Sequence, residues 1–193
     1  MPRRGLTFVQ GHYYHLYNRG ANRQPIFVES ENYLFLLRLL KAYTSRFCLS
    51  VIAYCLMPNH YHLLVRQDAD QPAGRLPAAV FNSYTKALNK RCGRTGALFE
   101  GRYRAVDVDR EEYLLHLCRY IHGNPVKGGL VEHVEAWPYS NYHEWVGART
   151  GALVDREFMC TWFPGAGRYA RFVRDYLSGR DGLPIGIEGY TIE

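Results

Sequence analysis

The nine-residue segment MPNHYHLLV, at positions 57–65, constrains the fold of this chain more than any other feature. A Pro-Asn turn signal comes first, and the apolar residues after it predict a β-strand. Strand side chains alternate between two faces, so His60 and His62 would share one face while Tyr61 points to the other. Two imidazoles side by side on a strand can form half of a divalent-metal site, or they can simply pack and hydrogen-bond at a sheet surface.

A second segment, 111–126, has the spacing of an amphipathic helix. Asp109 is a suitable N-cap residue. Gly123 and the Asn-Pro step after it predict the helix end, because the residue before a proline is disfavoured in the α region. Tyr120 would therefore lie in the last turn, with Asn124 four residues later and already leaving helical geometry. The buried stripe would consist of Tyr113, Leu114, Leu117, Cys118 and Ile121.

Hydrophobic periodicity predicts an ordered series of strands and helices before residue 130. The order is β-α-β-β-α-β followed by the helix that carries Tyr120. This order is typical of an α+β fold, the ferredoxin-like (split βαβ) arrangement, with an antiparallel sheet and helices on one face. The expected strands cover about 12–19, 47–56, 60–66 and 102–108, and the expected helices about 30–45, 76–92 and 110–123.

The chain changes character after residue 130. We expect residues 1–130 to form one domain that carries both segments and residues 131–193 to form a C-terminal extension packed on the core. Turn-like stretches interrupt the extension, and it ends in a segment rich in Gly and Pro. Its aromatic residues could stack on nucleic-acid bases, but packing onto the core is the preferred interpretation. These aromatic residues are Trp137, Tyr139, Tyr142 and Trp145.

The charge of the chain is unevenly distributed. Residues 1–130 hold 18 Lys and Arg against 9 Asp and Glu, a net of +9, whereas residues 131–193 hold 6 against 9, a net of −3. A basic field over the first segment would favour a polyanionic partner and release counterions when phosphates bind. Many soluble proteins carry a similar charge without binding nucleic acid, so the charge alone does not establish nucleic acid as the partner.

Cysteine usage and hydropathy bear on the compartment. The chain has 5 cysteines and no C-x-x-C pair, which argues against a disulfide framework or zinc ribbon and for a reducing cytoplasm. The sequence contains no apolar run as long as that of a signal peptide. It also contains no apolar run of about twenty residues, the length needed to cross a membrane. We therefore expect a cytoplasmic protein without a membrane partner.

Taken together, the two segments resemble the single-tyrosine transposases of the HUH endonuclease superfamily, and within it the REP-associated tyrosine transposases. The resemblance rests on MPNHYHLLV at 57–65 and on RYIHGNPVKGGL at 119–130. It extends in order over most of the first 140 residues and implies an HUH endonuclease core. Further blocks with the family pattern lie at 17–27, 96–103 and 112–114.

The resemblance implies a metal-dependent single-stranded DNA endonuclease and strand transferase acting at hairpin-associated sites, such as repetitive extragenic palindromes. Tyr120 would be the nucleophile and would form a 5′-phosphotyrosine intermediate. His60, His62 and Asn124 would hold a divalent metal, Mg²⁺ or Mn²⁺, although the third ligand varies among relatives. The partner would be single-stranded and hairpin DNA. A monomer is favoured, with a homodimer as the alternative.

Basic residues near the expected site are candidates for DNA contact, because arginine suits bidentate phosphate or guanine contacts. Each of them is individually as well explained as a solvated surface charge. Two of them, Arg102 and Arg104, would share a strand face by the two-residue period. The six candidates are Arg19, Arg23, Arg102, Arg104, Arg119 and Lys127.

Several alternatives stay open at this point. His116 and His122, on either side of Tyr120, are rival ligands or proton carriers, and Glu100 could approach the metal, although all three are more typical of surface positions. The chain could instead be a ferredoxin-like nucleic-acid-binding protein without catalysis. It could also be a replication-initiator or relaxase-like HUH nuclease, but those usually carry longer chains or helicase-like partner domains.

Overall fold

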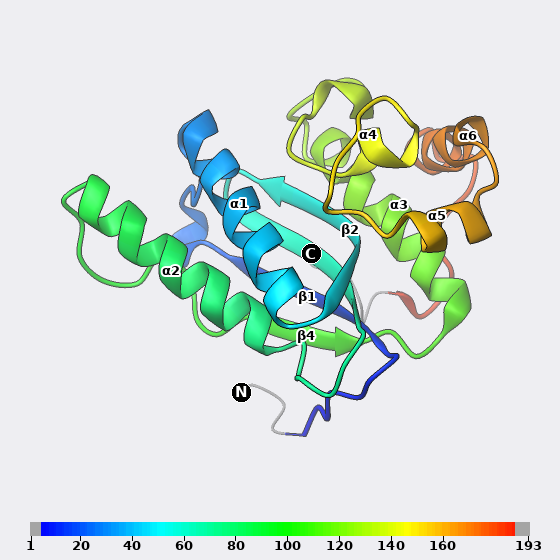
Figure 1. Cartoon of the computed structure of the whole chain (residues 1–193). Helices are drawn as coiled ribbons and strands as arrows, with labels where there is room; N and C mark the ends of the chain where they lie inside the picture. Colours follow the sequence, from blue (N-terminus) through cyan, green and yellow to red (C-terminus); the bar gives the residue numbers. More distant parts are fainter. Residues whose placement is uncertain (1–4, 188–193) are drawn as a thin grey trace.

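A computed structural model describes residues 5–187 and contains a four-stranded antiparallel sheet (Figure 1). Its strands are β1 (Tyr13–Arg19), β2 (Leu49–Met57), β3 (His60–Gln67) and β4 (Arg104–Asp107), in the order β2-β3-β1-β4. Each neighbouring pair is antiparallel. This is the split βαβ topology, so the predicted α+β, ferredoxin-like fold class is confirmed.

Two long helices cover one face of the sheet. Helix α1 (Ser30–Arg46) follows β1 and a 3-10 turn, η1 (Ala21–Arg23), and helix α2 (Arg75–Arg91) follows β3. As strand geometry requires, alternate strand residues project into the core beneath these helices. The strand residues of this core include Tyr14, Leu16, Tyr61, Leu63 and Val65.

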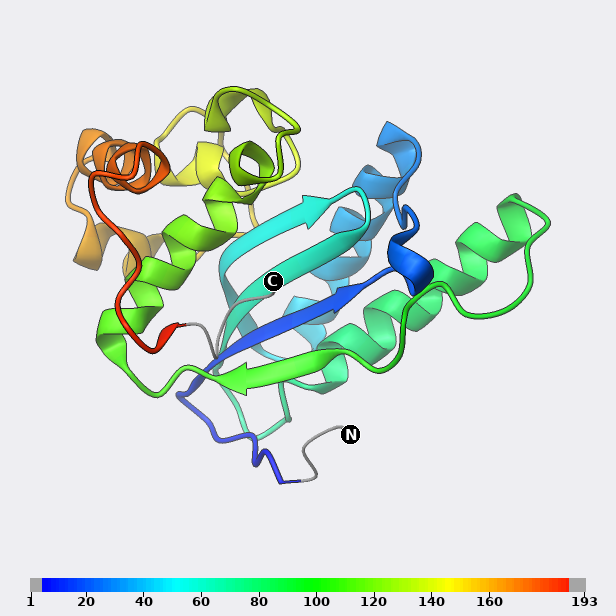
Figure 2. The same ribbon diagram turned by 180° about the vertical axis from the view of Figure 1, so that it is seen from behind.

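Helix α3 (Glu111–Lys127) lies on the opposite face, next to β2 (Figure 2). The prediction that the helices lie on one face therefore holds for α1 and α2 but not for α3. The N-cap residue of α3 is Arg110, one residue after the predicted cap Asp109. The physical reason for the second covered face is that β2 carries apolar side chains on both sides. Under α3 these side chains are Ile52, Ala53, Cys55 and Met57.

Helix α3 continues beyond its predicted end at Gly123 as far as Lys127. Pro125 removes one backbone donor, but the last turn is still closed by the hydrogen bond from the Gly128 amide to the Asn124 carbonyl at 2.8 Å. Asn124 is therefore helical and lies one turn after Tyr120 on the same side of the helix. The expectation that Asn124 leaves helical geometry is wrong.

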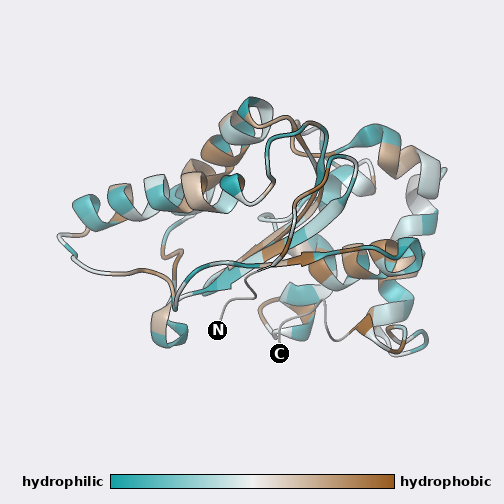
Figure 3. Ribbon diagram, turned by 90° about the horizontal axis from the view of Figure 1, so that it is seen from below, coloured by the Kyte–Doolittle hydropathy of each residue, from teal (hydrophilic) through white to brown (hydrophobic). Residues whose placement is uncertain are grey.

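The C-terminal extension contains a 3-10 turn and three helices. These are η2 (Val134–Ala136), α4 (Tyr142–Trp145), α5 (Arg156–Trp162) and α6 (Ala166–Leu177). Residues from these helices complete the core beside α3. Figure 3 shows hydrophobic residues concentrated in the central strands and hydrophilic residues along the projecting end of α2. No helix within residues 5–187 is long and apolar enough to span a membrane.

The four aromatic residues singled out in the extension pack against the rest of the chain. Tyr142 and Trp145 are buried. Tyr139 stacks on Tyr33 of α1, with ring centroids 3.7 Å apart. The Trp137 indole donates to the Leu56 carbonyl of β2 at 3.2 Å. Packing rather than base stacking is thus confirmed for these side chains, while the division of the chain at residue 130 stays a prediction.

Candidate active site

The predicted histidine pair lies on β3, and both side chains project from the face that α3 covers. The ring centroids of His60 and His62 are 5.1 Å apart and their planes are nearly perpendicular, at 88°. His60 is half-buried, whereas His62 is completely buried. Their shared face follows directly from the two-residue period of the strand.

Helix α3 brings Tyr120 and Asn124 to the same place. The Tyr120 ring meets the His62 ring edge-on, with centroids 5.6 Å apart. The Asn124 amide donates from Nδ2 to the Tyr120 carbonyl at 2.9 Å, and its side chain also forms a hydrogen bond with His60. Four residues proposed from two distant segments are therefore neighbours. We call them, with His15 of β1, the histidine site.

Each histidine of the pair has its Nδ1 atom engaged in a hydrogen bond. His60 Nδ1 lies 2.7 Å from Asn59 Oδ1, so Nδ1 carries the proton and donates it. His62 Nδ1 lies 3.0 Å from Nε2 of His15. The other nitrogen of His62, Nε2, is buried and has no hydrogen-bond partner among the described residues. A buried polar atom without a partner is uncommon and often marks a functional position.

The environment keeps both imidazoles neutral at pH 7. Burial lowers the pKa of His62 well below its ordinary value, and the nearby His15 and His60 lower it further. Burial also lowers the pKa of His60, and the positive charge of Arg19 adds to that effect, while the hydrogen bond with Asn124 opposes it. Neutral imidazole is the form that binds a metal ion.

The chemistry of these side chains suits a divalent cation. The site combines two imidazoles with one carboxamide, and a ligand set of this kind leaves open positions for phosphate and water. Within residues 5–187 no group of three or more His, Cys, Asp or Glu side chains could hold a metal ion. The carboxamide of Asn124, next to His60, is the candidate for a third ligand.

Two residues of this face escaped the sequence analysis, His15 and Tyr17 of β1. In the sheet register Tyr17 is directly opposite His62. The Tyr17 ring lies 4.8 Å from the His15 ring and 6.2 Å from the His62 ring. The sequence does contain a signal for them. Residues 15, 17 and 19 are two apart along the first strand and so share one face, as His60 and His62 do.

Two of the predicted DNA contacts flank the site. Arg19 is opposite His60 in the register, and its guanidinium binds Glu100 Oε2 from Nε at 3.0 Å and from Nη2 at 2.9 Å. Arg104 is opposite Tyr17 on β4 and is exposed. Both side chains share the strand face of the histidine pair.

The other predicted contacts are more scattered. Arg23 and Arg102 are exposed. Arg102 precedes the first residue of β4, Arg104, so the argument that these two share a strand face does not hold. Lys127 is exposed at the end of α3, with Nζ 5.0 Å from the centroid of the Tyr176 ring.

Arg119 is not available for DNA, which corrects the sequence prediction. Its side chain is fully buried and forms an ion pair with Asp181. A second hydrogen bond goes to the Gly182 carbonyl, and the guanidinium stacks over Phe172 at 4.3 Å. The reason is its position on α3, since residue 119 faces helix α6 whereas Tyr120, one residue later, faces the sheet.

The rival ligands do not join the site. His122 is fully buried away from β3, where it bonds Asn141 and Tyr169. This excludes both the ligand role and the surface position expected for it. His116 packs against Phe172, with ring centroids 5.4 Å apart. Glu100 is exposed and paired with Arg19, as described above.

The profile of a known family, described as "Transposase IS200 like", matches residues 8–124. The chain belongs to this family. The matched range contains every residue of the histidine site, from His15 to Asn124. It leaves out the C-terminal extension, so the family relationship concerns the sheet, the two crossover helices and nearly all of α3.

Individual relatives agree with the IS200-like assignment. A protein of Haemophilus influenzae assigned to the REP-associated tyrosine transposases is 34% identical over 104 residues, which are 48% of this chain and 58% of the relative. The chain thus matches little more than half of that relative's length. The predicted resemblance to REP-associated tyrosine transposases is confirmed.

Solved structures were also found to be similar to this member of the IS200-like family. A REP-associated tyrosine transposase bound to a REP hairpin has a TM-score of 0.66 at 20% identity, over 80% of this chain and 94% of that chain. A protein of Deinococcus radiodurans assigned as a transposase has a TM-score of 0.44 at 20% identity, over 63% of this chain and 96% of that chain. The first of these matches shows a common fold.

Proposed function

We propose that this IS200-like transposase cuts and rejoins single-stranded DNA through Tyr120, with a divalent metal held by His60, His62 and Asn124. The observation that carries the proposal is the buried Nε2 of His62, which has no partner among residues 5–187 and belongs to a ring whose centroid is 5.6 Å from that of Tyr120. A neutral imidazole with such a nitrogen, close to a carboxamide side chain and a phenol, has the composition of a metal-assisted nucleophilic site.

The reaction is a transesterification. The Tyr120 oxygen would form a bond to phosphorus while the bond from phosphorus to the 3′ oxygen breaks, which leaves a 5′-phosphotyrosine and a free 3′-hydroxyl. The phenol proton would leave as the new bond forms, since free tyrosine, with a pKa of about 10, is mostly protonated at neutral pH. A bound Mg²⁺ or Mn²⁺ would offset the negative charge of the phosphate.

The described residues would position the reactants. Helix α3 fixes Tyr120 over the sheet, and the hydrogen bond from Asn124 to the Tyr120 carbonyl ties the two residues together. Attack by a 3′-hydroxyl on the phosphotyrosine reverses the chemistry, so joining needs no nucleotide cofactor. Because the energy of the phosphodiester stays in the covalent link, the same residues would serve cutting and strand transfer.

We also propose a DNA hairpin with adjacent single-stranded bases as the substrate. The solved relative described above is bound to a REP hairpin. In this chain, Arg19 and Arg104 flank the histidine site and could contact the phosphates of a strand that crosses it. Arg23, Arg102 and Lys127 are exposed and could extend that contact.

A cytoplasmic monomer is the form we propose for the protein. The proposed nucleophile and the proposed ligands are neighbours within one chain, which supports a site that needs no second copy. All five cysteines are free, which suits a reducing compartment.

The deciding experiment is to trap the covalent intermediate. The protein would be incubated with Mn²⁺ and a labelled hairpin oligonucleotide with single-stranded flanks, then run on a denaturing gel. A labelled protein band is expected with Mn²⁺ and is expected to disappear with a chelator. Tyr120→Phe should lower adduct formation at least about 1,000-fold, because the nucleophile is removed.

Tyr139→Phe is the matched control, since Tyr139 stacks on Tyr33 outside the site. It should form adduct like the unaltered protein. An adduct that survives Tyr120→Phe would overturn the nucleophile assignment. Tight DNA binding with no adduct under any metal condition would instead identify a non-catalytic binding protein.

A further inference from the structure

His15 is the one fully buried histidine of the site that is outside the proposed ligand set. It lies on β1, beside the strand that carries His62, and its side chain is 0% exposed. The two rings are nearly parallel, at 16°, with centroids 5.2 Å apart. The hydrogen bond between His15 Nε2 and His62 Nδ1, at 3.0 Å, joins them.

A hydrogen bond between two imidazole nitrogens holds one proton and so allows two arrangements. In the first, His62 carries its proton on Nδ1 and donates it to His15, which leaves a lone pair on His62 Nε2. In the second, His15 donates to His62, and the His62 proton is on Nε2. Only the first arrangement leaves His62 Nε2 able to bind a cation.

His60 has its proton on Nδ1, as His62 does in the first arrangement, but its acceptor is Asn59. His60 Nδ1 lies 2.7 Å from Asn59 Oδ1, and a carboxamide oxygen can only accept. His60 must therefore donate from Nδ1 and keep its lone pair on Nε2. The same requirement applies to His62, but His15 is the group that meets it. Partners of this kind fix the tautomer and orientation of a metal-binding histidine.

We infer that His15 is a positioning residue that accepts the Nδ1 proton of His62 and thereby keeps His62 Nε2 as a lone pair facing the histidine site. This inference rests on the proposed function, since it is cation binding that requires the lone pair on His62 Nε2, but the proton position can be measured without metal or DNA. His15 would not touch the metal or the DNA. It would act through His62, by orienting the ring and excluding the tautomer that cannot bind.

The first test reads the proton directly. In protein labelled with ¹⁵N at histidine and free of metal, the two ring nitrogens of His62 give different chemical shifts when one is protonated and the other is not. We expect the Nδ1-protonated pattern for His62 at neutral pH. An Nε2-protonated pattern in the unaltered protein would overturn the inference, whatever the protein does with metal or DNA.

The second test compares two substitutions of His15. His15→Phe keeps a flat ring for stacking but removes the acceptor, and it should lower the affinity for Mn²⁺ by about 10- to 100-fold, measured by calorimetry. His15→Gln supplies a carboxamide oxygen, as Asn59 does for His60, and should keep the affinity within about 5-fold of the unaltered protein.

These outcomes separate the inference from the proposed function. If the unaltered protein binds no Mn²⁺ and forms no adduct, the proposed function fails, while the tautomer experiment still decides the role of His15. If His15→Phe is folded and binds Mn²⁺ as well as the unaltered protein does, the positioning role is wrong. If His15→Phe does not fold, the result from the unaltered protein and the His15→Gln affinity decide the question.

Discussion

His62 and His122 are both completely buried, but they differ in how many of their ring nitrogens have partners. His122 bonds Tyr169 through Nδ1 and Asn141 through Nε2. His62 bonds His15 through Nδ1, and its Nε2 has no partner among residues 5–187. Burial lowers the pKa of both. Burial and a lowered pKa therefore do not distinguish these two histidines, whereas the unpartnered nitrogen of His62, which we propose as a metal ligand, does.

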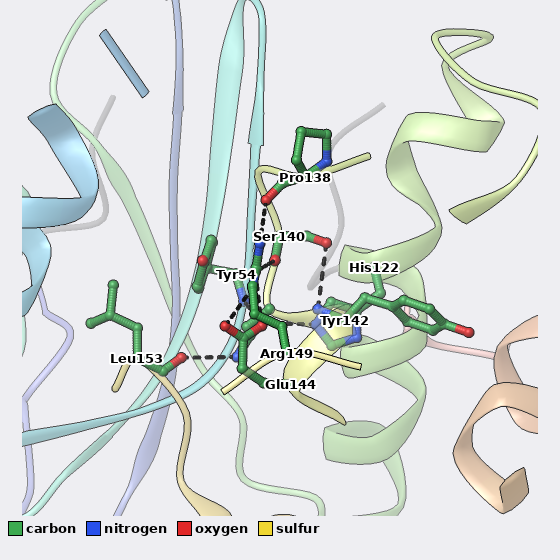
Figure 4. Close-up of polar contacts among 9 residues, drawn as sticks. Tyr54, His122, Pro138, Ser140, Tyr142, Glu144, Arg149 and Leu153 are labelled. Carbon is green, nitrogen blue, oxygen red and sulfur yellow. Dashed lines mark hydrogen bonds and ion pairs between the residues drawn. The ribbon is translucent and has the colours of Figure 1, made fainter. Parts of the chain in front are cut away.

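The surroundings of His122 form what we call the edge cluster, which consists of His122, Asn141, Glu144, Arg149 and Tyr169. Figure 4 shows His122, Glu144 and Arg149 of this cluster beside β2. Arg149 binds both carboxylate oxygens of Glu144 at 2.8 Å. Asn141 bonds the Tyr54 amide at 2.7 Å and the Ile52 carbonyl at 2.9 Å, both on the open edge of β2. An uncovered sheet edge invites pairing with other chains. The edge cluster therefore attaches the extension to the sheet and stabilises the fold.

The largest effect on stability is expected from Asn141→Ala. The substitution leaves the buried Tyr54 amide, His122 Nε2 and the Leu153 carbonyl without a partner, whereas the Ile52 carbonyl still accepts from the Trp145 indole. At about 1 kcal/mol or more for each buried group, the free energy of unfolding should fall by about 4 kcal/mol. Urea unfolding followed by circular dichroism would measure it.

Asn82→Ala provides the control, because Asn82 is exposed on α2. It should change the free energy of unfolding by less than about 0.5 kcal/mol. If Asn141→Ala is as stable as this control, the edge cluster does not hold the extension in place. The structural role assigned to His122, in contrast to His62, would then be wrong.

The second effect is a pH dependence that comes from His122. Burial lowers its pKa to about 4, so the folded state does not take up the proton that the unfolded state binds at about 6.5. The stabilisation is complete above pH 6.5 and is lost as the pH falls toward 4, by about 3 kcal/mol in total. Urea unfolding at a series of pH values would show this slope.

The same series on His122→Gln isolates this contribution from those of the other histidines. Gln can still bond Asn141 and Tyr169 but does not titrate. Its stability should therefore fall less steeply between pH 6.5 and pH 4 than that of the unaltered protein. Equal slopes for the two proteins would mean that His122 takes up its proton as readily in the folded state as in the unfolded one.

Local pattern was enough to predict the strands and the crossover helices, whereas the family resemblance was needed to predict that His60 and His62 lie near Tyr120. The period of two on β3 and the helical spacing on α3 are short-range properties, and the family resemblance linked them. The end of α3 could not be predicted in the same way. Pro125 disfavours a helix locally, but contacts of the last turn with the rest of the protein outweigh the loss of one hydrogen bond.

Roles that depend on tertiary packing were the ones the sequence left undetermined. Arg119 and Tyr120 are adjacent, but the helix turns the first toward α6 and the second toward the sheet. The sequence around His122 predicts a surface position, because it does not show that Asn141 and Tyr169 of the extension bond the two ring nitrogens. The contact of His15 with His62 depends on which strands are neighbours, and the histidine pair alone gives no information on that.

The smallest effect on stability, together with a large effect on function, is expected from His60→Ala. His60 is half-buried, and its one protein acceptor at Nδ1 is the adjacent Asn59, so the free energy of unfolding should change by less than about 1 kcal/mol. Its loss as a ligand should lower the affinity for Mn²⁺ by at least about 100-fold, since even partners of the ligands contribute 10- to 100-fold.

The exposed His133 gives the control, and His133→Ala should alter neither the stability nor the Mn²⁺ affinity. If His60→Ala loses stability yet keeps its affinity for Mn²⁺, His60 is a structural histidine, as His122 is. His62 would then have no second imidazole with which to bind a metal ion.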